Sequence, residues 1–378
     1  MIVQILHFAS LAILFLYISL MVFYWFHWTK TKQDRGVVPI KNAPSISVVI
    51  VGRNEAKNLM SCVDSIISND YPKSQFEVLY IDDFSTDNSI EILKAINFEN
   101  FNFFKLKDFI GDNKIINYKK TAIEFAVSKA IGDIILQTDA DTIVGEKWIL
   151  SHANKYSSDK INFITGPVLF KSGNSSLEEF QKYDFLATMG VTCAGINSGL
   201  HYMANGANMS YRKGISTKSN SNYASGDDMF LVQKIAKDHP NSIGFLKNKD
   251  AIVYTYPEST IKEFINQRLR WATKTKAYES PNMKYIVILI FVTNLLILSN
   301  IIAILFLKTD QLYFAISLVL FKLIVDSIFI KSIASFFEEK ISAIEMFIAL
   351  LKYPIYIVFI GVLSLFKNKY QWKSRIVK

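Results

Sequence analysis

Long apolar stretches lie at the two ends of the chain, and this segregation constrains the fold more than any other feature. No residue from Ile2 to Trp28 carries a formal charge, and about 20 apolar residues suffice for a helix to span the hydrocarbon core of a bilayer. Three further apolar stretches occupy residues 285–307, 312–330 and 344–366. The hydrophobic content of 51% and the mean hydropathy of +0.22 agree with a membrane protein.

The flanks of the first stretch predict its orientation. Aromatic residues at its end, from Tyr24 to Trp28, are typical of a membrane interface, and basic residues follow between Lys30 and Arg35. By the positive-inside tendency, the middle of the chain is then cytoplasmic. A cleaved signal peptide is a weaker interpretation, because the apolar run is too long and no small-residue cleavage site follows it.

The C-terminal stretches fit less simply. Residues 285–307 and 312–330 predict a membrane hairpin, within which Lys322 and Asp326 are spaced to pair on one helix face. We favour a structural, mutually neutralised pair over a role in a substrate path. Lys352 and Pro354 interrupt the stretch 344–366, which either crosses the membrane or forms a re-entrant or interfacial helix. The expected organisation is a transmembrane helix at 1–28, a cytoplasmic domain at 29–284, a membrane region at 285–366 and a basic tail at 367–378, in a multi-pass protein of the cell membrane.

The central residues show short apolar strands that alternate with amphipathic helices, the pattern of an α/β domain with a mostly parallel sheet. The predicted strands are residues 46–51, 77–81 and 133–137, and the predicted helices are residues 57–68, 89–96 and 118–130. A further amphipathic helix is expected to begin near Thr260.

Each predicted strand ends in polar residues that include carboxylates. In open α/β sheets, ligands bind beyond the carboxyl ends of the strands. Asp139 and Asp141 are two apart, so that in an extended segment both side chains face one pocket. A site this acidic predicts a divalent metal, Mg²⁺ or Mn²⁺, that holds a diphosphate. Two solvated aspartates in a polar loop are the alternative for this pair alone.

Several function classes lack support. The net charge of +9 is not gathered into one basic face with interleaved aromatic residues, so nucleic acid is not an expected partner. Neither GxGxxG nor GxxxxGK[ST] occurs, and Cys62 and Cys193 match no metal spacing. Only six of the 42 cations are arginines, which makes each a candidate for gripping carboxylate or phosphate. These are Arg35, Arg53, Arg212, Arg268, Arg270 and Arg375; four of them fall in the motifs below, but we expect Arg268 to be solvated or at lipid headgroups.

An ordered set of motifs between Ser45 and Trp271 resembles the processive-type family 2 glycosyltransferases, which are membrane enzymes with a cytoplasmic GT-A domain. That family includes cellulose, chitin and hyaluronan synthases and ceramide glucosyltransferase. The motifs are SVVIVGRNEAKNL at 47–59, IDDFSTDNS at 81–89, KKTAIEFA at 119–126, QTDADT at 137–142, NGANMSYR at 205–212, SGDDMFL at 225–231 and QRLRW at 267–271.

The resemblance implies a role for each matching residue. Asp141 would ligate the metal, and Asp228 would be the catalytic base, with Asp227 as the other candidate in a doublet that is usually Glu-Asp. Asn205, Gly206, Asn208 and Trp271 would contact the acceptor. The nucleotide-sugar would be bound by Val51, Arg53, Glu55, Asp82, Asp83, Lys119, Lys120, Asp139, Gln267 and Arg270.

The implied activity is an inverting transfer from a UDP-sugar donor to a lipid-linked or glycan acceptor. We favour the lipid-linked acceptor, because at most four spans are too few for the bundle that threads a polymer. A processive polysaccharide synthase is the alternative, and an oligomer is possible. A non-catalytic nucleotide-binding scaffold is less favoured, because carboxylates occupy every expected position. The small-residue stretch 187–199 is expected to pack beneath the site or to line an acceptor path, and His152, His201 and His239 to be structural or exposed.

Overall fold

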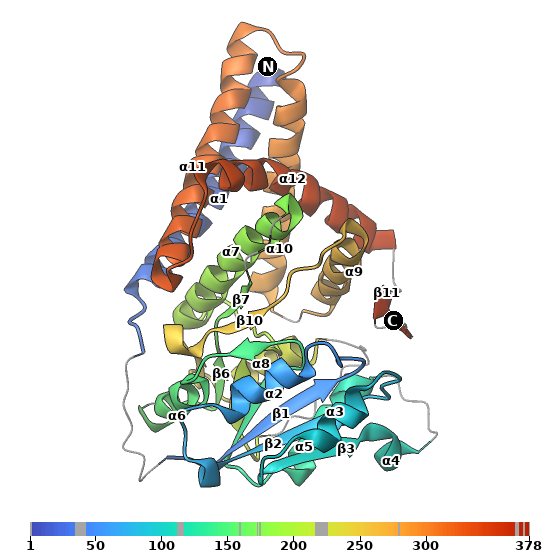
Figure 1. The fold of residues 1–378 in the computed structure, drawn as a ribbon. Coiled ribbons are helices and arrows are strands. Elements are labelled where there is room, and N and C mark those ends of the chain that lie inside the picture. Colours follow the sequence, from blue (N-terminus) through green and yellow to red (C-terminus); the bar gives the residue numbers. More distant parts are fainter. Residues whose placement is uncertain are drawn as a thin grey trace. The chain divides into compact units, whose positions relative to one another are not determined.

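The computed structural model describes residues 2–34, 43–111, 117–158, 160–171, 173, 175–215, 226–278, 280–366, 370–372 and 375–377. The chain divides into two compact units, each assembled from separate segments (Figure 1). We call residues 32–171, 202–256 and 371–378 the sheet unit. Residues 1–31, 172–201 and 257–370 form the helical unit.

A mostly parallel sheet of seven strands forms the centre of the sheet unit, as the alternating pattern predicts. The strand order is β3-β2-β1-β4-β8-β6-β9, in which β8 alone runs antiparallel to its neighbours. The strands are β1 (Ile46–Gly52), β2 (Phe76–Asp82), β3 (Phe101–Lys105), β4 (Ile134–Asp139), β6 (Phe163–Thr165), β8 (Met209–Arg212) and β9 (Ile243–Phe245). A smaller sheet contains β5 (Ile143–Val144), β10 (Val253–Thr255) and β7 (Val168–Phe170), and β11 (Tyr370–Trp372) pairs with β12 (Arg375–Val377).

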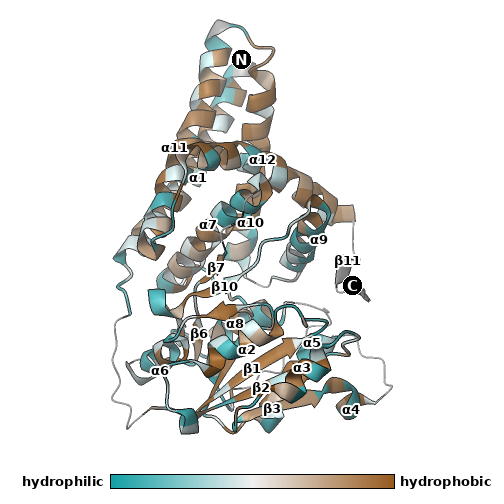
Figure 2. Ribbon diagram, viewed as in Figure 1, coloured by the Kyte–Doolittle hydropathy of each residue, from teal (hydrophilic) through white to brown (hydrophobic). Residues whose placement is uncertain are grey.

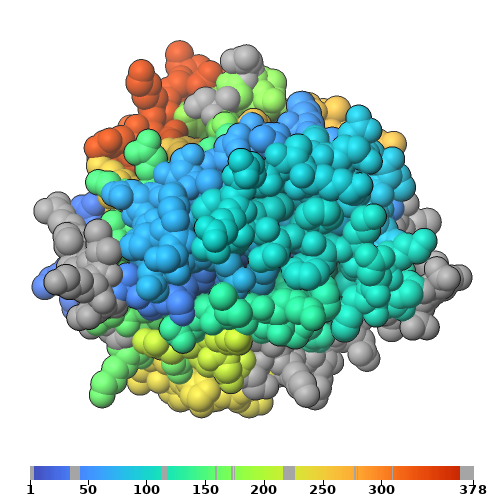
Figure 3. Space-filling model, turned by 60° about the horizontal axis from the view of Figure 1, so that its bottom comes forward, coloured from blue at the N-terminus to red at the C-terminus, as the bar shows by residue number. Residues whose placement is uncertain are grey.

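Helices cover this sheet because their apolar faces match its buried strands. Residues Leu59, Cys62, Val63 and Ile66 recur at helical spacing and are all buried. Figure 2 shows hydrophobic colour along β1 and β2. Figure 3 shows the surface formed by the β1–β3 half of the unit. The helices are α2 (Leu59–Ile67), α3 (Ser89–Ala95), α4 (Leu106–Ile110), α5 (Tyr118–Lys129), α6 (Trp148–Ser158) and α8 (Asp227–Asp238), with 3-10 turns at Lys73–Gln75 and Lys249–Ala251.

Among its described residues, the helical unit contains four helices that are long and apolar enough to cross a membrane. They match the apolar stretches of the sequence and are hydrophobic along most of their length in Figure 2. These helices are α1 (Ile2–Lys30), α10 (Pro281–Ala303), α11 (Thr309–Phe337) and α12 (Ala343–Phe366). Inside α11, Lys322 and Asp326 pair at 2.6 Å with exposed fractions of 1% and 7%, which confirms the pairing expected from their spacing.

Two more helices belong to the helical unit although the hydropathy of the chain assigns them to the central domain. They are α7 (Ser176–Ser198) and α9 (Ile261–Ala272), followed by a 3-10 turn at Thr273–Ala277. A capping box between Ser175 and Glu178 begins α7, and Gly199 ends it in the left-handed conformation. Packing places them in the helical unit, since α7 packs against α1, α11 and α12, and α9 against α12. Hydropathy did not indicate this, because both helices contain polar residues.

The last apolar stretch forms one continuous helix, α12, despite Pro354 in its interior. In Figure 1 this helix runs across the directions of α1, α10 and α11 rather than alongside them. The Lys352 ammonium donates to the Ser176 hydroxyl at 2.8 Å. Whether α12 crosses the membrane or lies at its interface stays a prediction, and the transverse direction favours the interface.

Candidate active site

The carboxyl ends of β2, β1 and β4 lie side by side at one edge of the sheet. In the parallel register Gly52 faces Asp82, and Val51 faces Asp139. Strand topology therefore brings together three sequence segments that lie far apart in the chain. This edge is where an open α/β sheet binds ligands.

Glycine is needed at position 52, the last residue of β1, because a side chain does not fit there. A Cβ atom at this position would lie 1.8 Å from the Tyr80 hydroxyl oxygen and 2.9 Å from the Cβ of Ala140. The absent side chain lets β1, β2 and the turn after β4 approach closely. The strand edge at the site is therefore tightly packed.

The turn after β2 is fixed by the turn after β1. The Arg53 Nη1 atom donates to the carbonyl oxygens of Asp83 and Phe84 at 2.9 and 2.8 Å. The Asn54 side chain accepts from the Thr86 amide at 2.7 Å. Asn54 and Phe84 have positive φ angles of 54° and 57°, uncommon for residues other than glycine. Arg53 thus stabilises the turn after β2 through these backbone contacts.

The acids expected to bind the nucleotide are largely buried here. Asp83 is fully buried, and Asp82 is 3% exposed. One Asp82 oxygen accepts from the Ser85 amide at 3.2 Å, while the other has no hydrogen-bond partner in the described part of the chain. Glu55 is also buried, and its amide donates to the Ser89 hydroxyl at 3.1 Å. This carboxylate oxygen is therefore a buried polar atom that the described residues leave unsatisfied.

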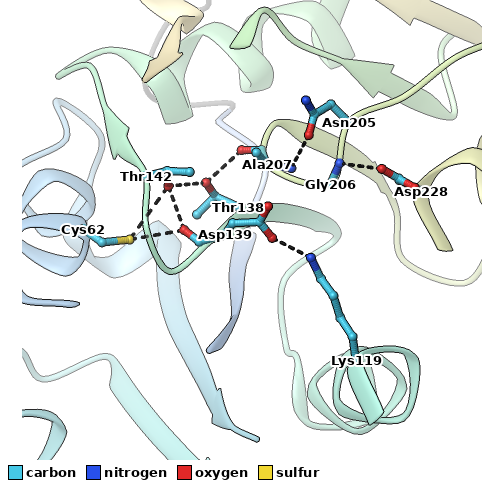
Figure 4. Close-up of polar contacts among 9 residues, drawn as sticks. All are labelled: Cys62, Lys119, Thr138, Asp139, Thr142, Asn205, Gly206, Ala207 and Asp228. Carbon is cyan, nitrogen blue, oxygen red and sulfur yellow. Dashed lines mark hydrogen bonds and ion pairs between the residues drawn. The ribbon is translucent and has the colours of Figure 1, made fainter. Parts of the chain in front are cut away.

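Lys119, Asp139, Gly206 and Asp228 meet in one cluster, drawn in Figure 4. The Lys119 ammonium pairs with the Asp139 carboxylate at 2.6 Å, and both side chains are about one-third exposed. The Gly206 amide donates to Asp228 Oδ2 at 3.1 Å. A Cβ atom on Gly206 would lie 3.7 Å from the Lys119 nitrogen and 3.8 Å from Asp228 Oδ2. The missing side chain leaves room for about one methyl-sized group between a cation and a carboxylate.

The acidic doublet lies in the first turn of α8, where the helix dipole stabilises negative charge. The Asp228 Oδ1 atom accepts from the Met229 amide at 2.8 Å, so both of its oxygens are oriented by backbone donors. Asp227 instead accepts from the Asn117 side chain at 3.0 Å. The geometry distinguishes the two residues: Asp228 adjoins Gly206, and Asp227 anchors the start of α5.

Behind Asp139 lies a set of contacts that sequence reasoning missed. The Thr142 hydroxyl donates to the Asp139 carbonyl at 2.7 Å, and the Thr138 hydroxyl donates to the Ala207 carbonyl at 2.8 Å. The Cys62 thiol lies 3.5 Å from the Asp139 carbonyl, and burial raises the pKa of this thiol to about 12. These contacts tie the end of β4 to the Asn205–Asn208 segment. Their only sequence signal is the pair of threonines beside the aspartates.

The prediction that Asn208 contacts the acceptor is wrong. It is fully buried, and its Oδ1 accepts from Trp148 Nε1 and lies 2.9 Å from His152 Nε2. Its Nδ2 donates to the carbonyl oxygens of Pro167 and Ala251, both at 2.8 Å. The amide group is thus saturated within the protein and has no free donor or acceptor for a sugar. Asn208 supports the loop that carries Asn205 and Gly206.

Two other arginines also bind the protein itself. Arg212 donates to the carbonyl oxygens of Ile161 and Tyr156 at 2.9 and 3.2 Å. The expectation of a solvated Arg268 is wrong: it is 3% exposed and pairs with Asp184 at 2.9 Å. The guanidinium of Arg270 makes no hydrogen bond or ion pair with any described residue.

The segment Gln267–Trp271 lies on α9 and belongs to the helical unit, whereas the cluster around Lys119 and Asp228 belongs to the sheet unit. Gln267 donates to Glu258 at 2.8 Å, and burial raises the pKa of that carboxyl. The Trp271 ring carries the Arg268 guanidinium 4.3 Å from its centroid, and Phe185 lies 6.0 Å away. Trp271 is therefore largely committed to packing within the helical unit.

The donor atoms at the strand edge fit a divalent metal in part. Asp141 is partly buried and stands two residues after Asp139, which already pairs with Lys119. No group of three or more His, Cys, Asp or Glu side chains with metal-site geometry occurs among the described residues. Carboxylate oxygens suit Mg²⁺ or Mn²⁺, and such ions commonly complete their coordination with phosphate and water. The residues thus fit an ion that is held jointly with a diphosphate.

Comparison with known proteins identifies relatives for both units. The model described as glycosyl transferase family group 2 matches residues 134–364, more than half of the chain, and the model described as glycosyl transferase family 2 matches residues 47–216. The chain is 28% identical over 146 residues to glycosyltransferase AglE of Haloferax volcanii, covering 39% of this chain and 46% of that protein.

A second relative, from Methanococcus voltae, is a dolichyl N-acetyl-alpha-D-glucosaminyl phosphate 3-beta-D-2,3-diacetamido-2,3-dideoxy-beta-D-glucuronosyltransferase. It is 25% identical over 115 residues, covering 30% of this chain and 35% of that protein. The matches thus span less than half the length of these two relatives. Among solved structures, the mannosyltransferase PcManGT from Pyrobaculum calidifontis in complex with GDP-Man and Mn²⁺ superposes with a TM-score of 0.58. At 16% identity, over 95% of this chain and 96% of that one, it shows a shared fold.

Proposed function

The chain belongs to glycosyltransferase family 2, and from that premise we propose that it transfers a sugar from a UDP-sugar to a hydroxyl group of a lipid-linked acceptor, with inversion at the anomeric carbon. The observation that carries this proposal is the cluster of Lys119, Asp139, Gly206 and Asp228 at the carboxyl edge of the sheet. It combines a cation for phosphate with a carboxylate that can act as a general base, and the glycine at 206 places no side chain between them.

The donor is proposed to bind along the ends of β1, β2 and β4. Asp82 and Asp83 line the turn where the uracil ring would lie. Lys119 and Lys120, at the start of α5, would contact the diphosphate. Asp139 would contact ribose or the donor sugar. A metal held by Asp141 and the diphosphate would stabilise the charge of the leaving group. Arg270 is the other proposed partner of that charge.

Asp228 is the proposed base. As the acceptor oxygen bonds to the anomeric carbon, the bond from that carbon to the phosphate oxygen breaks, and UDP leaves from the opposite face. The acceptor hydroxyl proton passes to the Asp228 carboxylate. Two backbone amides hold this carboxylate at 3.1 and 2.8 Å and so fix its direction before the acceptor arrives. Asp227 is turned to Asn117 and is the weaker candidate.

A lipid-linked acceptor is favoured by the helical unit. Its four apolar helices would place the enzyme in the membrane, with the sheet unit proposed to be cytoplasmic. The name of the Methanococcus voltae relative includes a dolichyl-linked sugar phosphate, which is a lipid-linked acceptor. Because the described helices offer at most four spans, a channel for a growing polymer is the less economical arrangement.

The test uses the full-length protein in detergent or nanodiscs, with Mn²⁺, a panel of UDP- and GDP-sugars and a native membrane lipid extract. Nucleotide release and the mass of the lipid product are measured together. Asp228→Asn is expected to lower transfer by about 10²- to 10⁴-fold, because it removes the base. Asp141→Asn is expected to raise the Mn²⁺ concentration needed for half-maximal rate.

Asp238→Asn is the matched control, since Asp238 lies at the other end of α8 and forms an exposed pair with Lys234. This variant is expected to retain the wild-type rate. If Asp228→Asn and Asp141→Asn both release nucleotide at the wild-type rate, the proposed site is wrong. Transfer from GDP-sugars alone would refute the choice of UDP.

A further inference from the structure

A cavity of about 80 Å³ lies inside the helical unit, among α1, α7, α10, α11 and α12. Its wall is mainly apolar, and its two charged residues, Asp184 and Asp326, are both neutralised. Asp184 pairs with Arg268 at 2.9 Å, and Asp326 pairs with Lys322 at 2.6 Å. Asp326 also accepts from the Tyr17 hydroxyl at 2.7 Å. The cavity therefore suits an apolar ligand.

Small side chains create this space. At Gly190 the helices α7 and α11 touch, since a Cβ atom there would lie 2.1 Å from the side chain of Ile333. One helical turn earlier on α7, Ala187 lines the cavity, and Ala349 lines it from α12. Residues three apart share a helix face, so the close contact at Gly190 is followed along the same face by a gap. A larger residue at Ala187 would fill that gap.

The cavity lies toward one end of the apolar helices. Its lining residues on α1 run from Tyr17 to Tyr24, in the half of the helix that leads to Lys30. With a rise of about 1.5 Å per residue, Tyr24 is about 9 Å from Lys30 along the helix. In a membrane this depth corresponds to the lipid chains of a single leaflet. Lipid hydrocarbon is accordingly the apolar molecule available to the cavity at this depth.

We propose that the cavity holds a segment of the hydrocarbon chain of the lipid acceptor, and so favours acceptors that carry a lipid anchor. An apolar cavity of about 150 Å³ takes up benzene, so about 80 Å³ accommodates a short chain segment and not a whole lipid. The identity of this lipid as the acceptor rests on the proposed function; the presence of a bound chain does not.

The test compares Ala187→Phe, which fills the cavity, with Ala9→Phe, which adds the same ring at an exposed position of α1. With native lipid extract as acceptor, Ala187→Phe is expected to raise the lipid concentration for half-maximal transfer by about 15- to 60-fold. This range corresponds to two or three methylene groups that lose their burial. Nucleotide release without lipid is expected to stay unchanged, and Ala9→Phe to behave as wild type.

Mass spectrometry of lipid retained by the purified protein gives a second readout. Wild type and Ala9→Phe are expected to retain a lipid that Ala187→Phe loses. Equal retention, or an unchanged lipid dependence in a folded Ala187→Phe protein, overturns the proposal. If Ala187→Phe does not fold, Ala349→Leu tests the same cavity from α12. If wild type retains lipid but transfers no sugar to it, the proposed acceptor is wrong while the cavity assignment stands.

Discussion

Breaking the buried pair between Arg268 and Asp184 is expected to destabilise the helical unit strongly, whereas replacing both residues is not. The pair joins α9 to α7 at 2.9 Å, with exposed side-chain fractions of 3% and 8%. Burial raises the pKa of the Asp184 carboxyl, against the opposing effect of Arg268. The ion pair therefore does not fully offset the cost of removing the carboxylate from water.

The magnitude follows from these contacts. Asp184→Leu leaves a buried guanidinium without its anion, which costs about 3–5 kcal/mol. Arg268→Met leaves the carboxylate alone and also removes the cation–π contacts, 4.3 Å from the Trp271 centroid and 5.0 Å from that of Phe264. The double variant removes both charges of this pair and loses only the cation–π part, about 1–2 kcal/mol. The coupling between the two positions is thus expected to be about 3 kcal/mol or more.

Thermal unfolding of the purified protein in detergent, followed by tryptophan fluorescence at one fixed scan rate, measures these differences. For a unit of this size, 1 kcal/mol corresponds to about 2–4 °C in Tm. Asp184→Leu is expected to unfold about 6–20 °C below wild type, Arg268→Met somewhat further below because it also loses the cation–π contacts, and the double variant within about 8 °C of wild type. Lys234→Met, at the exposed Lys234–Asp238 pair, is the control and is expected to show no measurable shift.

Two results would refute this reasoning. Shifts below about 2 °C in both single variants would show that the pair is solvated. A double variant that loses the sum of the two single effects would show that the residues act independently, and that the cost lies elsewhere than in an uncompensated buried charge.

Two further predictions concern the sheet unit. Burial lowers the pKa of His152 from its usual 6.5 to about 4. The stability that depends on neutral His152 is therefore fully present above pH 6.5, and about 3 kcal/mol of it is lost as the pH falls from 6.5 to 4. His152→Gln should flatten the pH dependence of Tm measured over that window, and an unchanged slope would contradict this prediction. Cys62 and Cys193 are both buried, so maleimide should label neither thiol in the folded protein and both in dodecyl sulfate, and rapid labelling of the folded protein would contradict the burial.

Much of the fold was predictable because its signals are local. The run from Ile46 to Val51 is apolar and β-branched, and polar residues end it; the structure extends it by a single residue, to Gly52. The charge-free stretch from Ile2 to Trp28 forms α1. Parallel strands then bring their carboxyl ends to one edge, so three local predictions were enough to place Asp82 beside the end of β1 and Asp139 next to it.

The partners of polar side chains were not predictable, because they depend on contacts between distant segments. The scarcity of arginine suggested planar recognition of an anion, and Arg268 does bind a carboxylate. Its partner, however, is Asp184 on another helix of the same unit. Similarly, α7 has the composition of a soluble helix, and only its packing against α1, α11 and α12 places it in the helical unit.

The contacts behind the acids show why a motif does not by itself assign a role. Asp139 is held through the contacts of Thr138 and Cys62, whose partners lie 69 and 77 residues away in sequence. Asn208 belongs to the same motif as Asn205 and Gly206, yet its four amide contacts are all internal. A substitution at Asn208 would therefore act on the reaction by displacing Gly206, whose amide orients Asp228. Loss of activity in such a variant is evidence for acceptor contact only if Asp228 keeps its position.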